Sequence, residues 1–197
     1  MHRPLVPLPL EFYQRETADV AKALLGKVVI HESDSQLLSG RIVEVEAYGG
    51  KEDPASHAHR NKTSRNSVMF GRPGRAYIYF IYGTHYCLNV VAHDVGVPGA
   101  ALIRALEPLD GIALMKKNRG IQDTRQLMAG PGRLTKALNI GIKMSGVDLT
   151  RSRKLLITED KSYKEINIDS SPRIGIRVGM DRAWRFNVRG NQFVSRR

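Results

Sequence analysis

Two glutamates stand in an otherwise apolar segment, GRIVEVEAY (residues 40–48). Alternate residues of a strand share a face, so Glu44, Glu46 and Tyr48 are expected to lie together with Ile42, opposite a face of valine and alanine. A face with two carboxylates and an aromatic ring either meets solvent on a half-exposed edge strand or lines a polar cleft. An acid–base pair formed by the two glutamates is one alternative that this pattern leaves open.

The arginine of ALIRALEP (residues 101–108) has apolar neighbours on both sides. Because an unpaired buried charge is very costly, we expect Arg104 to pair with a carboxylate from a neighbouring strand, either Glu46 or Glu44. Such a pair is either an isolated structural ion pair or a place where a carboxylate and an arginine jointly hold a water molecule. The second interpretation makes these two strands a candidate catalytic site.

A tyrosine-rich stretch, residues 71–91, predicts a β-hairpin. Residues 76–81 and 86–91 are rich in aromatic and β-branched side chains, and Gly83 between them supplies the backbone freedom that a tight turn needs. Tyr82 then stands at the protruding tip, where it cannot reach the core of its own domain.

The hairpin tyrosines favour a role in binding. Tyr77 and Tyr79 share a face and are expected to flank a flat ligand, whereas Tyr82 is placed to insert between DNA bases and hold a helix open. The alternative is that these tyrosines are ordinary core and edge aromatics. The basic net charge of the chain and the expected burial of Arg104 favour the interpretation of Tyr82 as a DNA wedge over that of an ordinary aromatic.

Two neighbouring histidines and a single cysteine are further groups that could react or bind a ligand. His57 and His59 stand two apart, but neither a cysteine pair nor an HExxH motif accompanies them, so we expect no metal and no cofactor. A histidine that lines a pocket is the favoured interpretation of His57. The single cysteine, Cys87, has no partner for an internal disulfide. GPGRLTKAL (residues 130–138) either binds phosphate or merely begins a helix.

The composition bounds the class of protein. The 197 residues include 31 basic and 19 acidic side chains, a formal net charge of +12, and 42% hydrophobic residues. This charge indicates an anionic partner, with nucleic acid ahead of an anionic membrane surface, unless it serves only solubility. The chain has no run of 18 apolar residues, and its start does not resemble a secretory signal, so we expect a cytoplasmic protein without a membrane span.

The helices and strands expected along the chain predict an α+β fold. Helices are expected at 15–27, 110–120 and 130–141, and strands at 27–32, 39–50, 76–81, 86–91 and 99–108. Residues 150–170 are expected to form an exposed strand-and-loop excursion, and residues 1–11 an N-terminal arm. Without a regular βαβ rhythm, this order favours one mixed domain over residues 1–197. We expect a curved, mainly antiparallel sheet, a partial barrel surrounded by helices, from which the hairpin protrudes.

Eight segments, taken together and in order, resemble the alkyladenine (3-methyladenine) DNA glycosylase family. They cover the chain from about residue 10 to residue 195. They are LLGKVVI, GRIVEVEAYGG, EDPASHA, TSRNSVMFGRPGRAYIYFIYGTHYCLNVV, ALIRALEPLDG, GPGRLTKALNI, SPRIGI and WRFNVRGNQFVS.

The resemblance implies a monofunctional glycosylase that excises damaged purines from double-stranded DNA by attack of water and leaves an abasic site. The expected bases are 3-methyladenine, 7-methylguanine and hypoxanthine. In the family the glutamate of EAY is the general base, here Glu46, and the arginine of RALEP, here Arg104, helps bind the water. The family fold is a mixed domain on a curved, mainly antiparallel sheet that carries no metal.

The resemblance also implies which residues form the base pocket. The extruded base stacks on Tyr48 and Tyr79, His57 contacts the base and its sugar–phosphate, and Asn89 discriminates among purines. The backbone of PRIG, around Ile174, helps position the water.

DNA contacts outside the pocket are expected at the hairpin and at arginines. Tyr82 corresponds to the family's intercalating tyrosine, and the adjacent Thr84 stands where the family commonly has methionine, so entry into the groove is expected to be weaker or different. Arg65, Arg72, Arg75 and the arginines of the C-terminal tail are expected to bind phosphates, with an affinity that falls with salt. A monomer is the expected state.

Two further interpretations stay open at this stage. A non-catalytic nucleic-acid-binding module would bind DNA without Glu46 and release no base. A small-molecule nucleoside hydrolase would act on free nucleosides with little dependence on salt.

Overall fold

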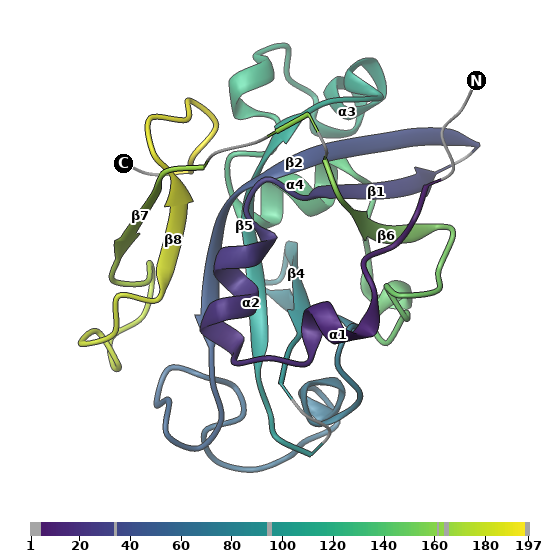
Figure 1. Cartoon of the computed structure of the whole chain (residues 1–197). Helices are drawn as coiled ribbons and strands as arrows, with labels where there is room; N and C mark the ends of the chain where they lie inside the picture. The colour runs from purple at the N-terminus through teal and green to yellow at the C-terminus, as the bar shows by residue number, and fades with distance from the viewer. Residues whose placement is uncertain (1–4, 34, 94–95, 161, 164–165, 196–197) are drawn as a thin grey trace.

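The computed structural model describes residues 5–33, 35–93, 96–160, 162–163 and 166–195. Within this part of the chain, eight strands form one curled sheet in which all paired strands run antiparallel, with four α-helices around it (Figure 1). This arrangement confirms the predicted α+β class and the curved, partly barrel-like sheet.

The strands are β1 (Val28–Ser33), β2 (Gln36–Tyr48), β3 (Ala76–Ile81), β4 (His85–Val91), β5 (Ala100–Pro108), β6 (Leu155–Thr158), β7 (Ile168–Ser171) and β8 (Arg185–Val188). The α-helices are α1 (Leu10–Tyr13), α2 (Thr17–Leu24), α3 (Ile112–Arg119) and α4 (Pro131–Ala137). Three short 3₁₀-helices, η1 (Ser67–Phe70), η2 (Thr124–Gln126) and η3 (Ile142–Met144), lie in the connections.

The long strand β2 occupies the middle of the sheet. Along one edge it pairs first with β1 and then, through residues 44–46, with β8, while β5 runs along its other edge. An edge position for this strand, one of the two alternatives, is therefore wrong. Because neighbouring strands cover both of its edges, its glutamates are removed from solvent.

The alternation of faces predicted for β2 breaks at its centre. The pairing with β5 is irregular between Ile42 and Val45, as at a β-bulge, where an extra residue bends the strand and changes which side chains share a face. As a result Ile42 packs in the hydrophobic core together with Val43 and Val45, instead of joining the glutamates. Helix α2 lies against β2 and buries Val20 and Leu24 in that core (Figure 1).

The segment predicted as an exposed excursion, residues 150–170, contains a buried strand instead. Strand β6 pairs with β1, and Leu155, Leu156 and Ile157 are each 1% exposed. The physical reason is the run of three apolar residues, because the free energy gained by burying them exceeds the cost of ordering the polar segment around them. Its outer edge receives the start of the chain, where the Leu8 amide donates to the Ile157 carbonyl at 2.8 Å.

Strands β3 and β4 are neighbours in sequence and pair from Ala76 with Val90 to Ile81 with His85. Three residues connect them, and both Tyr82 (φ +53°) and Gly83 (φ +67°) take the left-handed backbone conformation. Tyr82 is 82% exposed. None of the helices in the described part of the chain has the length and hydropathy needed to cross a bilayer.

Candidate active site

Arg104 on β5 bonds both glutamates of β2. Its Nε donates to Glu44 Oε1 at 2.9 Å and its Nη1 donates to Glu46 Oε2 at 3.2 Å. Both carboxylates are fully buried and Arg104 is 7% exposed. The predicted pairing of Arg104 with a glutamate of the neighbouring strand is confirmed, and Arg104 bonds both glutamates rather than one of them.

Glu46 accepts hydrogen bonds from three donors. The Ile174 amide donates to Oε1 at 2.7 Å, while the Tyr48 hydroxyl, at 2.9 Å, and Arg104 donate to Oε2. A carboxylate offers about four lone-pair positions, so one position, on Oε1, stays free in this arrangement. Glu46 is thus held in place by three donors and keeps one acceptor position on Oε1.

Glu44 has a different environment although it shares the same arginine. Its Oε1 also accepts from Arg185 Nε at 2.7 Å, and its Oε2 accepts from the Ser195 amide at 2.7 Å. Burial alone raises the pKa of Glu44, but the Ser195 hydrogen bond and the charges of Arg104 and Arg185 hold that pKa below its usual value. A carboxyl group with a lowered pKa stays ionised at neutral pH, so Glu44 is unsuited to donate a proton.

A cavity of about 500 Å³ opens beside this cluster. Five of the predicted base-pocket residues and Arg104 line it: Tyr48, His57, Tyr79, Asn89, Ile174 and Arg104. Three of these, Tyr48, Arg104 and Ile174, are the residues that bond Glu46, so the carboxylate lies directly behind the cavity wall.

The aromatic wall is built from β3 and the loop after β2. The His57 ring lies edge-on to Tyr79, with centroids 4.6 Å apart, and its Nδ1 is 3.0 Å from the Tyr77 hydroxyl. Burial, followed by the charge of Arg65, lowers the pKa of His57, which favours the neutral imidazole. Burial also raises the pKa of Tyr79, so its ring is uncharged.

Tyr77 and Tyr79 do not flank a ligand between them. Their ring centroids are 5.3 Å apart at a tilt of 39°, so the rings pack on each other, and Tyr77 is only 1% exposed. Two residues apart on a strand, they share a face as predicted, but side chains on one face pack side by side. Both tyrosines line the cavity, and the buried Tyr77 ring supports the Tyr79 ring.

Asn89 has a fixed orientation in the cavity wall. Its Nδ2 donates to the Tyr77 carbonyl at 3.0 Å, which leaves Oδ1 as the acceptor that this side chain offers. Asn89 is only 3% exposed, so a hydrogen bond between its side chain and a ligand would form away from bulk water and would therefore be stronger than at the surface.

The hairpin tip stands at the cavity opening. Tyr82 and His85 line the cavity, and Thr84 is exposed, with its hydroxyl 3.4 Å from the Tyr82 carbonyl. Gly132 of α4 packs so closely on His85 that an added Cβ would lie 2.8 Å from its ring. The sequence did not identify His85 or this glycine contact, because both depend on how α4 folds back onto β4.

The predicted DNA-binding arginines lie in two places. Arg65 lies beside the cavity, with its guanidinium 5.2 Å from the Tyr79 ring centroid. Arg72 and Arg75 lie at the other end of β3, about 20 Å from the tip for six strand residues. Arg75 there bonds the Gly146 carbonyl at 2.8 Å and lies 3.7 Å from Asp148.

Two arginines of the C-terminal tail are internal, contrary to the expectation of a phosphate-binding tail. Arg173 and Arg185 are 4% and 7% exposed and pair with Asp53 and Glu44. Burying them offsets the charge of those carboxylates, which removes both guanidiniums from any DNA surface. Among the described residues no group of three or more histidine, cysteine or acidic side chains could hold a metal ion.

Comparison with known proteins identifies the family. The model of the methylpurine-DNA glycosylase (MPG) family matches residues 11–192. A protein of Carboxydothermus hydrogenoformans named "putative 3-methyladenine DNA glycosylase" is 48% identical, over 96% of this chain and 99% of its own. Proteins of the same name from Burkholderia lata and Chlorobaculum tepidum are 47% and 45% identical, over 98% and 96% of this chain and 92% and 90% of theirs. The chain therefore belongs to the methylpurine-DNA glycosylase family, hydrolases of N-glycosyl bonds that act in base excision repair.

Proposed function

We propose that this enzyme extrudes alkylated or deaminated purines from duplex DNA and excises them with water. The proposed substrates are 3-methyladenine, 7-methylguanine and hypoxanthine, and the product is an abasic site. The observation that carries the proposal is the buried Glu46 carboxylate, which three donors hold behind the wall of an aromatic cavity of about 500 Å³. That volume is in the usual range for small-ligand sites.

Glu46 is proposed as the general base. Its remaining lone-pair position on Oε1 accepts the proton of a water molecule, whose oxygen then bonds the sugar carbon as the glycosidic bond breaks. Arg104 fixes the carboxylate and supplies a donor at the cavity wall. The negative charge of Glu46 also stabilises the positive charge that develops on the sugar in the transition state.

One carboxylate is sufficient for a purine that is already cationic. Sugar glycosidases usually use two carboxylates, an acid and a base or nucleophile. Here the second carboxylate, Glu44, has a lowered pKa, and Ser195, Arg104 and Arg185 bond it. A 3- or 7-alkylated purine leaves as a neutral base without a proton donor, and this supports the preference for alkylated purines.

Base selection is assigned to the cavity walls. Stacking on Tyr48 and Tyr79 contributes roughly 1–3 kcal/mol per base, and a cationic base gains further from cation–π attraction. Asn89, with Oδ1 as acceptor, is proposed to discriminate among purines, and His57 to contact the base and its sugar–phosphate.

Duplex binding is assigned to the hairpin and the arginines. The exposed Tyr82 ring is proposed as the wedge that replaces the extruded base, with Thr84 beside it. Arg65, Arg72 and Arg75 are proposed to bind phosphates, and the enzyme to act as a monomer. Among the described residues that line the cavity there is no lysine to form a Schiff base, which supports a monofunctional enzyme without strand cleavage.

Base release by the wild-type protein tests this function. The substrates are methylated duplex, a duplex with one hypoxanthine, undamaged duplex, and free 7-methylguanosine and inosine. We expect release from at least one damaged duplex, an unbroken strand until alkali is added, and no reaction with the free nucleosides. Hydrolysis of free nucleosides would indicate a nucleoside hydrolase, and salt-sensitive DNA binding without base release would indicate a binding module.

A further inference from the structure

A completely buried ion pair joins two loops behind the cavity. Arg173 Nη1 and Nη2 donate to the two oxygens of Asp53 at 2.6 and 2.7 Å, and both side chains are 0% exposed. This is the two-pronged geometry of arginine with a carboxylate, which a lysine cannot reproduce. A buried ion pair is in itself weak evidence for stability, so its position in the fold decides what it does.

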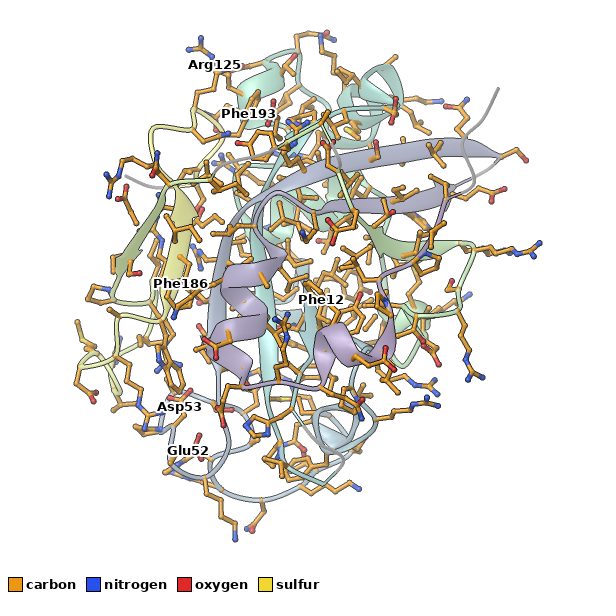
Figure 2. All side chains as sticks on the ribbon, in the orientation of Figure 1. Phe12, Glu52, Asp53, Arg125, Phe186 and Phe193 are labelled. Carbon is orange, nitrogen blue, oxygen red and sulfur yellow. The ribbon has the colours of Figure 1, made fainter. Side chains whose placement is uncertain are left out.

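The pair connects the end of β2 and the loop after it, which carries Asp53, with the segment between β7 and β8, which carries Arg173. Arg173 Nη1 also donates to the Ala47 carbonyl at 2.9 Å, and Asp53 accepts from the Gly49 amide at 2.9 Å. Arg173 Nη2 reaches the Gly179 carbonyl at 3.2 Å. Figure 2 shows Asp53 in the loop after β2, beside the segment that links β7 to β8.

Two of the three donors to Glu46 depend directly on Arg173. Ile174, whose amide donates to Glu46 Oε1, is the next residue in the chain. The Arg173 guanidinium also lies 4.8 Å from the centroid of the Tyr48 ring, whose hydroxyl donates to Glu46 Oε2. Arg173 has no hydrogen bond to Glu46 among the described contacts, so apart from the attraction between their charges it acts on the carboxylate through these two neighbours.

The pair remains ionic in the folded protein. Burial opposes the charge of both partners. The hydrogen bonds from Arg173 and from the Gly49 amide nevertheless keep the pKa of Asp53 below its usual value. The hydrogen bonds to Asp53 likewise keep the pKa of Arg173 above its usual value. A charged, two-pronged contact is more rigid than a single hydrogen bond, so it resists small shifts of the loop that carries Ile174.

We propose that Asp53 and Arg173 form a positioning pair that holds the Ile174 amide and the Tyr48 ring against Glu46, and thereby sets the geometry in which Glu46 activates water. This inference rests on the proposed function of Glu46. Neither residue of the pair lines the cavity or touches a reacting atom, so their effect is on the chemical step and not on DNA binding.

The test compares Arg173→Lys with wild type and with a matched control. Arg173→Lys keeps a charge next to Asp53 but loses the two-pronged contact, whereas Asp53→Asn leaves a buried arginine unpaired and serves as the second variant. The control is Arg41→Lys in the first half of β2, where Arg41 is mostly buried and pairs with Glu107 and Asp160.

Three quantities are measured on each protein after its folded fraction is established by thermal melting. They are the single-turnover rate of base release from hypoxanthine or methylated duplex, the affinity for a duplex with one abasic site, and the hydrogen-exchange rate of the Ile174 amide. The abasic duplex places no base on Tyr48, so its affinity reports DNA binding alone.

We expect Arg173→Lys to release base about 100-fold more slowly per folded molecule, since a misplacement of about 1 Å has that effect on catalysis. Its affinity for the abasic duplex should match wild type, its Ile174 amide should exchange faster, and Arg41→Lys should behave as wild type in all three. A wild-type rate per folded molecule, or unchanged exchange of Ile174, would overturn the proposal. If wild type releases no base, the glycosylase function fails, while Ile174 exchange still decides whether the pair holds this amide.

Discussion

Removing the Tyr82 ring should weaken lesion binding without weakening the fold. The side chain is 82% exposed, so Tyr82→Ala should change the free energy of unfolding by no more than about 0.5 kcal/mol. Alanine meets the same left-handed backbone as tyrosine at this position (φ +53°), so the variant isolates the ring. If the ring stacks in the gap left by the base, its loss removes about 1–3 kcal/mol, or about 5- to 150-fold in affinity.

Fluorescence anisotropy on a duplex with one tetrahydrofuran abasic site measures this change, because the enzyme cannot hydrolyse that site. The matched control is Phe80→Ala on the same hairpin, where the ring is 47% exposed, lies on the strand face opposite Tyr79, and packs on Tyr86 with ring centroids 5.1 Å apart. The control should bind like wild type. Unchanged binding by Tyr82→Ala, or an equal loss in Phe80→Ala, would refute the wedge.

Three further changes probe the charge cluster and the DNA surface. Glu44→Gln should lose about 3–5 kcal/mol of unfolding free energy in urea melts at neutral pH, because it removes the buried negative charge that Arg104 and Arg185 both bond. Since the folded-state pKa of Glu44 lies below 4.5, wild type should lose this stabilisation as the pH falls below 4.5, and the gap between the two proteins should narrow there; a constant gap would argue against the lowered pKa. Tyr48→Phe keeps the ring but removes one donor to Glu46, so base release should slow by about tenfold, the equivalent of one hydrogen bond to a charged group, with unchanged affinity for the abasic duplex; equal rates would dissociate this hydroxyl from catalysis. Arg65→Ala should weaken DNA binding and reduce the slope of log affinity against log salt by about 1, whereas an unchanged slope would place Arg65 away from phosphate.

The ion pairing of Arg104 on β5 with the glutamates of β2 could be predicted from the sequence, because a buried charge requires a partner of opposite charge. An arginine with apolar neighbours needs a carboxylate partner, because an unpaired buried charge is costly, so a contact of Arg104 with either Glu46 or Glu44 could be predicted. The structure shows that Arg104 contacts both. The periodic strands and the short helices were likewise readable, since their apolar spacing repeats over several residues.

Other features depend on contacts between segments far apart in the chain. Asp53 and Arg173 are 120 residues apart, and nothing in the pattern of either loop indicates the other. The bulge that moves Ile42 into the core is set by the pairing of β2 with β5, and the burial of Leu156 in β6 is set by β1 and the start of the chain. The burial of these residues is therefore set by the pairing of strands far apart in the chain, which local strand propensity does not predict.

The most direct test of Glu46 as the general base compares the single-turnover rate of base release by wild type and Glu46→Gln on one damaged duplex at saturating enzyme. The glutamine keeps the size of the side chain and its acceptor oxygen but cannot accept a proton from water. We expect Glu46→Gln to release base at a rate at least about 100-fold lower than wild type, the smallest usual contribution of a general base, with unchanged affinity for the abasic duplex. Excision by Glu46→Gln at a rate comparable to wild type would contradict this expectation and remove Glu46 from the chemical step.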